Sequence, residues 1–235
     1  YRLNGGKIWC TNSAVSDFVV VAAKTGDSEE RGNINFFIVE KGMKGFSVGR
    51  KEDKLGARGV PSSAIFFEEV LIPEENRLGP EGEGFKIVME ALNKARPVIA
   101  ARGVGLAQGA IDHAQAFISE RRAFGQAVKD FQGVRWILAD MQIQTEAARG
   151  LVYKVASGVD AGLEGNDLAI QAAIAKCHAT DTAMQVATDA VQLFGASGIS
   201  NEYPINRYFR DAKVLQVVEG TNQIQRNIIS RIMLR

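Results

Sequence analysis

The sequence predicts an α+β fold in which a β module is followed by a bundle of antiparallel helices. Three observations support this class. Runs rich in Val, Ile and Phe, separated by turn residues, fill about the first seventy positions. A polar connector rich in Gly and Pro, LIPEENRLGPEGEGF, then occupies positions 71–85. Beyond it, apolar residues recur in steps of three and four, which is typical of helices with one buried face.

The β module is expected to contain a hairpin and three further strands. The stretch YRLNGGKIWCT places Asn4-Gly5-Gly6 between two short alternating segments, which is a hairpin signal. The stretches DFVVVAAKT, INFFIVEK and SAIFFEEVLI predict the other strands. Because the composition changes after Pro73, we predict a β domain at residues 1–75 and a helical domain at residues 76–235.

The helical domain begins with two segments. Positions 85–120 are rich in Ala and Gly, which lets helices approach closely, and Pro97 must start, kink or interrupt a helix there. The next helix has a buried seam in steps of four and three. Its members are Val134, Leu138, Met141, Thr145, Ala148, Val152 and Val155.

Two more helices complete the predicted bundle. One runs from about Asn166, as N-cap, to Gly195, as a stop signal. The other is TNQIQRNIISRIML, which is capped by Thr221 and places its apolar residues on related faces. These residues are Ile224, Ile228 and Met233.

Composition excludes several classes of function. The 235 residues are 46% hydrophobic and 23% charged, with a net charge of +1 and no run of Lys and Arg longer than a pair, so neither nucleic acid nor an acidic membrane surface is an expected partner. Cys10 and Cys177 are far apart, which suits a reducing compartment rather than a disulfide scaffold. No metal cluster and no membrane span is expected. The chain starts at Tyr1 within an apparent strand, so we expect an N-terminal part to be missing.

Glu219, in the segment LQVVEGTNQIQR, is the first candidate functional residue. It follows Val217-Val218 and precedes a helix start. It is either a carboxylate placed near a helix N-terminus, where the macrodipole favours negative charge, or a base in an apolar pocket from which the two Val residues exclude water. The sequence alone leaves both open.

Two further motifs carry polar and aromatic side chains suited to a nucleotide. QLFGASG holds Gln192 and Gly195 at a predicted helix end, where a Gly C-cap with an exposed Gln is the alternative. ERRAFG offers Arg121 for pyrophosphate and Phe124 for stacking on a purine. Phe131-Gln132 follows shortly after, and a solvated basic turn explains the arginines equally well.

KIWCTNS is the last such motif. On a regular strand Trp9 and Thr11 point to the same face, so one side chain can stack on a planar ring while the other donates a hydrogen bond. Burial of Trp9 in the core is the alternative.

Six stretches together resemble the acyl-CoA dehydrogenases in order and approximate spacing. They are WCTN, ARPVIAARGVGLAQGA, ERRAFG followed by FQ, DAVQLFGASG, YPINRYFRDAK and VVEGTNQIQR. The resemblance runs from Tyr1 to Arg235. It implies the last two-thirds of such an enzyme: a partial, β-barrel-like middle domain followed by a four-helix bundle. It also implies a homotetramer, a dimer of dimers, that binds FAD at subunit interfaces.

The resemblance implies a role for each motif. Glu219 would remove the α proton of an acyl-CoA thioester while hydride leaves the β carbon for the flavin, giving trans-2-enoyl-CoA, and electron-transferring flavoprotein would take the electrons. The implied FAD-binding residues are Trp9, Cys10, Thr11, Arg121, Phe124, Phe131, Gln132, Gln192, Gly195, Thr221 and Gln223. The implied substrate-binding residues are Arg96, Gly220 and Arg231. The implied compartment is the bacterial cytoplasm or the mitochondrial matrix, and β-oxidation is the commonest setting.

The sequence departs from the family pattern at Val218, where straight-chain enzymes commonly have Tyr. Some members place their base just before the Arg that matches Arg96, but Ala95 stands there, which favours Glu219. Two alternatives remain: an oxidase-like enzyme that uses oxygen, and a non-catalytic relative such as the DNA-associated alkylation-response flavoproteins.

Overall fold

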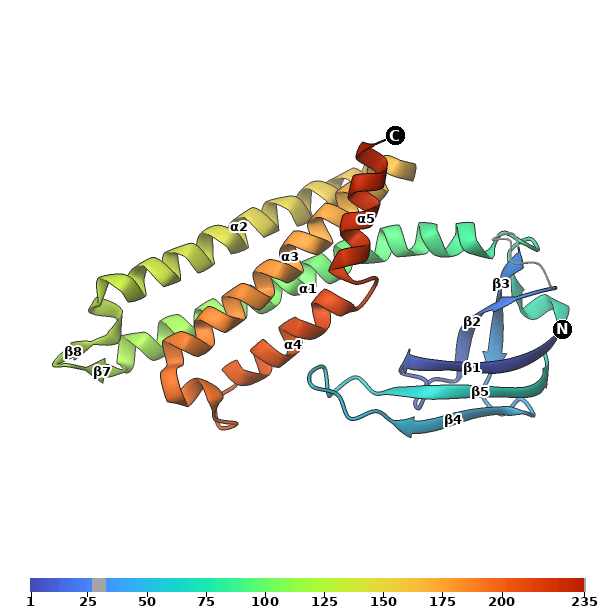
Figure 1. The fold of residues 1–235 in the computed structure, drawn as a ribbon, viewed down its shortest axis with the longest axis horizontal. Helices are drawn as coiled ribbons and strands as arrows, with labels where there is room; N and C mark the ends of the chain where they lie inside the picture. Colours follow the sequence, from blue (N-terminus) through green and yellow to red (C-terminus); the bar gives the residue numbers. More distant parts are fainter. Residues whose placement is uncertain (27–32, 235) are drawn as a thin grey trace. The chain divides into compact units, whose positions relative to one another are not determined.

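The computed structural model describes residues 1–26 and 33–234 of the chain. The chain forms two compact units, Tyr1–Ala91 and Leu92–Arg235 (Figure 1). The domain change predicted at residue 75 stays a prediction. In the described part of the chain, no helix is long and apolar enough to cross a membrane.

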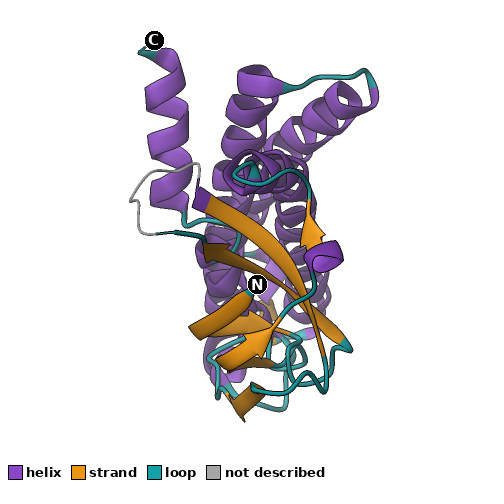
Figure 2. Cartoon of the chain, turned by 90° about the vertical axis from the view of Figure 1, so that its right-hand side faces the viewer, coloured by secondary structure: helices purple, strands orange, loops and turns teal. Residues whose placement is uncertain are grey.

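The first unit contains two open, antiparallel, three-stranded sheets (Figure 2). One has the order β1-β5-β4, and its strands are β1 (Arg2–Thr11), β5 (Ser62–Leu71) and β4 (Phe46–Lys51). The other has the order β2-β3-β6, and its strands are β2 (Phe18–Lys24), β3 (Ile34–Glu40) and β6 (Arg77–Leu78). The sheets do not close within the described residues, in agreement with the expected partial barrel. Strand β4, which contains Ser, Gly and Arg, was not predicted.

The core of this unit follows from alternation along the strands. In β3, Asn35, Phe37 and Val39 are buried while their neighbours are more exposed, as expected for a strand with one inner face. The Asn35 side chain satisfies its polar groups by donating to Thr25 Oγ1 at 2.8 Å and accepting from the Gly82 main-chain N–H at 2.8 Å. Phe37 and Val39 belong to a cluster of buried apolar residues that come mainly from β1, β2, β3 and β5.

The predicted N-terminal hairpin is wrong. Strand β1 continues through Asn4-Gly5-Gly6 and pairs with β5, with a register shift between Leu3 and Gly5. Asn4 Oδ1 accepts from the Glu69 N–H at 2.8 Å, and Gly5 has φ 125°. An Asn-Gly pair is favoured in bulges as well as in turns, so local sequence does not separate the two.

The second unit contains five α-helices within its described residues. They are α1 (Gly84–Glu120, which begins in the first unit), α2 (Gln132–Asp160), α3 (Gly165–Phe194), α4 (Ile205–Val217) and α5 (Asn222–Met233). Its shorter elements are the β7–β8 hairpin (Arg122–Ala123 and Gln126–Ala127) and the 3-10 helices η3 (Val128–Asp130) and η4 (Gly195–Ile199), whereas the 3-10 helix η2 (Glu74–Asn76) belongs to the first unit. Figure 1 shows α4 and α5 beside α3, which lies at the centre of their packing.

Small residues allow the helices to approach closely, as predicted. A Cβ at Gly103 of α1 would lie 2.9 Å from the Ala179 carbonyl oxygen of α3. In α2, Met141, Thr145, Ala148 and Val155 are buried, as expected, and the other members of the seam are half-buried. Pro97 lies inside α1, which continues on both sides.

The helix ends agree only in part with the sequence signals. Gly195 ends α3 with φ 57°, and the Thr221 side chain caps α5 by accepting from the Ile224 N–H at 3.3 Å, as predicted. Asn166 lies inside α3 rather than at its N-cap, which is Glu164. In α5, Ile228 is buried but Ile224 and Met233 are exposed, so the predicted apolar face is only partly correct.

Candidate active site

Glu219 lies in a tight turn between two helices. Helix α4 ends at Val217 and α5 begins at Asn222, with Val218 closing α4 through a 3.1 Å bond to the Val214 carbonyl oxygen. Glu219 and Gly220 both have left-handed backbones, with φ 55° and 87°. For a non-Gly residue this conformation costs about 1–3 kcal/mol, so the surrounding structure must impose it.

Two side chains hold the main chain of this turn. Lys176 of α3 is 0% exposed, and its Nζ donates to the Gly220 carbonyl oxygen at 3.0 Å and to the Gln216 carbonyl oxygen at 3.4 Å. Gln225 of α5, also buried, donates from Nε2 to the carbonyl oxygens of Glu219 at 3.3 Å and Gly220 at 2.8 Å. The turn is therefore fixed from α3 on one side and from α5 on the other.

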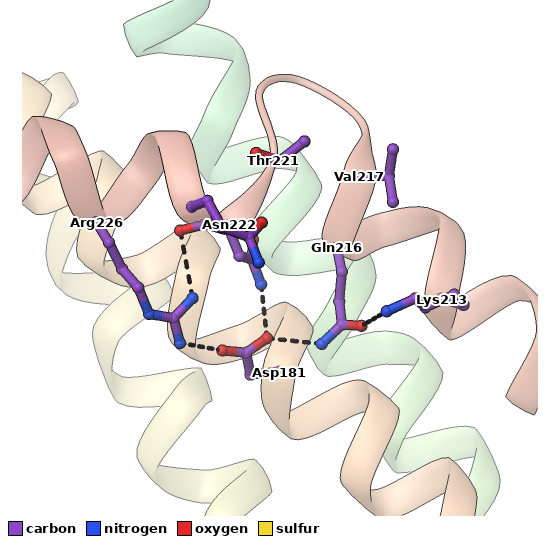
Figure 3. A pocket seen from close by; sticks show the side chains of 8 residues that line it. Asp181, Lys213, Gln216, Val217, Thr221, Asn222 and Arg226 are labelled. Atoms are coloured by element: carbon purple, nitrogen blue, oxygen red, sulfur yellow. Dashed lines mark hydrogen bonds and ion pairs between the residues drawn. The ribbon is translucent and has the colours of Figure 1, made fainter.

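Asp181 of α3 extends this network to the ends of α4 and α5. Its Oδ1 accepts from Gln216 and Asn222, each at 2.7 Å, and its Oδ2 forms a 2.7 Å ion pair with Arg226 (Figure 3). Burial acts to raise the pKa of Asp181, but the hydrogen bonds from Arg226, Asn222 and Gln216 outweigh it and hold that pKa below its ordinary value. The carboxylate is thus the common acceptor that joins three helices.

These residues line an open cavity of about 320 Å³ beside the turn. The lining consists of Asp181, Lys213, Gln216, Val217, Thr221, Asn222, Gln223 and Arg226. The lining is mainly polar, so it suits a ligand with several hydrogen-bonding groups. Val217 is exposed here rather than part of a closed apolar wall, which departs from the dry pocket expected around Glu219.

Glu219 has buried cations for neighbours. Arg96 of α1 is 2% exposed. Burial lowers its pKa, and the charge of Glu219 offsets this only in part. Burial lowers the pKa of Lys176 from 10.5 to about 8, against the opposing effect of several anionic groups that include Glu219. The half-buried carboxylate of Glu219 therefore lies in the field of two cations.

Two hydrogen-bond donors, one on Arg96 and one on the main chain of Glu219, have no acceptor within the described residues. Within the described residues, Arg96 donates from one terminal nitrogen to Asn93 Oδ1 at 2.7 Å, while its Nε has no hydrogen-bond partner. The main-chain N–H of Glu219 likewise has no acceptor in the described part of the chain. Both are donors left for a ligand or a solvent molecule.

A second set of predicted site residues lies at the far end of the bundle, and we call it the distal group. Its members are Arg121, Phe124, Phe131, Gln132, Gln192 and Gly195. The rings of Phe117 in α1 and Phe194 in α3 stack at 4.2 Å, which ties the ends of these helices together. The structure therefore brings the ERRAFG and QLFGASG motifs to one end of the second unit.

The distal group is exposed. The Phe124 side chain is 96% exposed, at φ 50°, and its ring meets that of Phe131 edge-on at 6.3 Å. Among the described residues, the Arg121 guanidinium has no hydrogen-bond or ion-pair partner. A flat aromatic face and an unpaired cation are suitable contacts for a purine and a phosphate.

The distal group and Glu219 are far apart. Lys176, beside Glu219, and Phe194, beside the distal group, belong to one straight helix, α3, and are separated by about 27 Å at 1.5 Å per residue. The structure therefore separates the predicted FAD contacts of the second unit into two places. Thr221, Gln223 and Gly220 lie beside Glu219, whereas exposed Arg231 lies in the last turn of α5.

Trp9, Cys10 and Thr11 belong to the first unit, whereas every other predicted site residue belongs to the second. Trp9 has φ 63°, and the register of β1 shifts between Lys7 and Cys10. This irregularity interrupts the pleat, so the argument that Trp9 and Thr11 must share a face does not hold. Trp9 is 59% exposed and Thr11 is exposed, so core burial of Trp9 is also wrong, and its ring is free for a planar ligand. Burial raises the pKa of the Cys10 thiol.

Sequence reasoning missed Lys176, Asp181, Asn222 and Gln225. A signal was present for the first of these, because Lys176 occupies the same helical stripe as Ala172, Ala179 and Ala183, all fully buried. A charged residue inside such a stripe is almost always paired or hydrogen-bonded.

Two known protein domains match the sequence of this chain. The acyl-CoA dehydrogenase middle domain matches residues 1–70, and the C-terminal domain of the same enzymes matches residues 82–234. The chain belongs to the acyl-CoA dehydrogenase family. The predicted family and fold class are therefore confirmed.

Two curated family members illustrate the similarity. A probable acyl-CoA dehydrogenase, FadE25, of Mycobacterium tuberculosis is 45% identical over 233 residues, which are 99% of this chain and 59% of that protein. The short-chain specific acyl-CoA dehydrogenase of Clostridium acetobutylicum is 44% identical over 235 residues, 100% of this chain and 61% of that protein. The chain thus spans about three-fifths of the length of these relatives.

Solved structures of similar proteins have the same fold. Butyryl-CoA dehydrogenase from Megasphaera elsdenii has a TM-score of 0.96 at 43% identity, and a chain from a structure described as electron transferring flavoprotein of Acidaminococcus fermentans has 0.96 at 46%. Each match covers 100% of this chain and 61% of the other. PigA with FAD and proline has a TM-score of 0.94 at 30% identity, covering 99% of this chain and 60% of that one.

Proposed function

We propose that the protein containing this chain is an FAD-dependent acyl-CoA dehydrogenase, in which Glu219 is the base that removes the α proton of an acyl-CoA thioester. The observation that carries the proposal is the turn itself. The backbone of Glu219 is strained, buried donors hold the main chain of its turn, and its main-chain N–H has no acceptor among the described residues. Strain of this kind is a recurrent feature of functional sites.

The reaction divides the work among these groups. The carboxylate of Glu219 accepts the α proton, the electrons of that C–H bond form the α,β double bond, and the β C–H electron pair leaves as hydride. FAD, when bound, accepts the hydride. Negative charge accumulates on the thioester oxygen as the α proton leaves, and the main-chain N–H of Glu219, which has no acceptor among the described residues, would supply a hydrogen bond to it. The product is trans-2-enoyl-CoA.

Substrate binding is assigned to the cationic residues near α5. The buried guanidinium of Arg96, with its Nε unpartnered in the described residues, suits a polar group of the acyl-CoA close to Glu219. Arg231, exposed in the last turn of α5, suits a phosphate group of the CoA. Gly220, which has no side chain, would let the main chain approach the ligand.

The proposed FAD-binding residues are of two kinds. Trp9, Cys10 and Thr11 in the first unit, and separately Thr221 and Gln223 in the second, are assigned to the flavin part, and the distal group is assigned to the adenosine and pyrophosphate. The separation of about 27 Å along α3 favours an arrangement in which the distal group serves the flavin of a neighbouring subunit. Such an arrangement requires at least two copies of the chain, and the proposed homotetramer, a dimer of dimers, meets this requirement.

The test is made on the complete natural protein loaded with FAD. Enoyl-CoA formation is measured anaerobically with a dye as electron acceptor, beginning with butyryl-CoA because two similar proteins carry short-chain names. Glu219→Gln is expected to lower kcat by roughly 100- to 10,000-fold, the usual contribution of a general base. An unchanged rate would remove Glu219 as the base.

The electron acceptor is tested in the same assay. Reduction of electron-transferring flavoprotein by acyl-CoA is the expected result, and stoichiometric peroxide formation in air would favour the oxidase-like alternative. Binding of DNA without enoyl-CoA formation would favour the non-catalytic one. The compartment, bacterial cytoplasm or mitochondrial matrix, stays a prediction.

A further inference from the structure

Lys176 is a buried charge that no step of the reaction uses directly. Its side chain is 0% exposed, and it comes from the middle of α3, a helix that contributes no residue to the predicted chemistry at Glu219. All three acceptors of its Nζ belong to the segment from Gln216 to Asn222, which is the segment that contains Glu219. These are the Gln216 carbonyl oxygen at 3.4 Å, the Gly220 carbonyl oxygen at 3.0 Å and Asn222 Oδ1 at 2.8 Å.

We propose that Lys176 is a positioning residue for proton abstraction, because its ammonium group fixes the Gly220 carbonyl and so the orientation of Glu219. The inference rests on the proposed function, since it assumes that Glu219 is the base. Lys176 acts through the main chain, and its nitrogen bonds to none of the reacting groups.

The count of donors and acceptors supports this role. An ammonium group has three N–H donors, and the segment offers it three acceptors, so the site is satisfied only when Lys176 is protonated. A neutral amine retains two donors and turns a lone pair toward the third acceptor. One of the acceptors, the Gln216 carbonyl oxygen, lies in the last turn of α4, where a cation is also favoured by the helix dipole.

Titratable groups surround Lys176 on several elements. Cys177 and Asp181 lie on its own helix, Arg96 on α1, Glu219 in the turn, and Arg226 of α5 pairs with Asp181. Burial is the largest influence and lowers the pKa of Lys176 to about 8. The number of bonds that hold the turn therefore changes within an accessible pH range.

The experiment isolates proton abstraction from hydride transfer. Acetyl-CoA has α protons but no β carbon, so it cannot be dehydrogenated, and exchange of its α protons with D₂O reports the base alone. In the complete protein loaded with FAD, we compare Lys176→Met and Lys176→Gln with Glu219→Gln. Lys154→Met, at an exposed position of α2, is the matched control.

Lys176→Met is expected to lower both the exchange rate and kcat at least tenfold, with FAD content unchanged and KM for butyryl-CoA changed less than twofold. Lys176→Gln, which keeps N–H donors, is expected to lose less, and Lys154→Met to lose nothing. In the wild type the exchange rate is expected to fall as the pH rises through about 8. This alkaline decrease is expected to be absent from both Lys176 variants.

If Lys176→Met shows the same exchange rate, kcat and alkaline decrease as the wild type, the proposal is overturned, while Glu219 can still be the base. Wild-type exchange in Glu219→Gln would instead overturn the proposed function. If Lys176→Met does not fold, the wild-type profile and Lys176→Gln decide. A wild-type exchange rate that stays constant from pH 7 to pH 9.5, together with wild-type exchange in Lys176→Gln, contradicts the positioning role.

Discussion

Arg226 of α5 and Asp181 of α3 form a 2.7 Å ion pair, although 45 residues separate them in the chain. The same carboxylate accepts from Asn222, the first residue of α5, and from Gln216 in the last turn of α4. One acceptor on α3 therefore sets the relative position of the two helices that hold the Glu219 turn between them.

Asp181 is expected to stabilise the fold in a pH-dependent manner. Because its pKa in the folded state is below the ordinary value of 3.8, its contribution is present above about pH 4 and is lost as the pH falls through the folded pKa. Asp181→Asn should therefore unfold more easily than the wild type at pH 7, by about 1–3 kcal/mol for hydrogen bonds to a charged group. Urea denaturation at several pH values measures this, with exposed Asp140→Asn as the control. A difference that does not shrink in acid would contradict the assignment.

Lys176 is expected to make the free energy of unfolding depend on pH in the alkaline range, where burial of its charge is unfavourable. Its folded pKa of about 8 lies below the ordinary 10.5, so between these values the unfolded chain binds an additional proton and the free energy of unfolding rises with pH. We expect the stability of the wild type relative to Lys176→Met to increase between pH 8 and pH 10, as measured by thermal unfolding. A constant difference across this range would show that the folded pKa is not lowered. Loss of the proton from Lys176 is thus expected to slow proton abstraction by Glu219 and to raise the stability of the fold.

Gly220→Ala tests the conformation of the turn. Gly220 has φ 87°, and an added Cβ would lie 2.9 Å from Gln225 Nε2, which must then move away from the carbonyl oxygens it holds. We expect a loss of about 1–2 kcal/mol in the free energy of unfolding together with a lower kcat. Gly150→Ala in α2, where nothing lies within 4 Å of the added Cβ, should be neutral or slightly stabilising. Equal effects of the two changes would refute the strained turn.

Arg121→Ala and Phe124→Ala test the distal group. Since the Phe124 side chain is 96% exposed and the Arg121 side chain has no partner among the described residues, neither change should alter the free energy of unfolding by more than about 0.5 kcal/mol. Each should weaken FAD binding at least tenfold, as measured by titration of the apoprotein. Arg102→Ala, at an exposed position of α1, is the control. Unchanged FAD affinity in both variants would exclude the distal group from the cofactor site.

The sequence predicted the strands and helices that have strong periodic patterns. The stretches that form β2, β3 and β5 are rich in β-branched and aromatic residues, and the seam of α2 repeats in steps of three and four. Helix α4 has only three buried residues, Ile205, Ala212 and Leu215, so its pattern is too sparse to stand out from the polar sequence around it. The Asn4-Gly5 bulge was read as a turn because the two share their local chemistry.

The candidate site was predictable only through motifs. Glu219, Arg121 and Gln192 are predicted as site residues because each lies in a distinctive short stretch. Lys176 and Gln225 were missed because their role depends on which carbonyl oxygens they meet, and those belong to residues up to 44 positions away along the chain. Side-chain donors that hold a main-chain turn have no signature of their own in sequence.

The distance along α3 between Glu219 and the distal group has a genetic consequence. Suppose that each flavin site combines Glu219 of one copy with Arg121 of its neighbour. Protein made of Glu219→Gln copies alone, or of Arg121→Ala copies alone, then has no intact site. A mixed pair of the two has one intact and one doubly damaged site, so co-expression of two defective alleles would restore activity that neither allele supplies by itself.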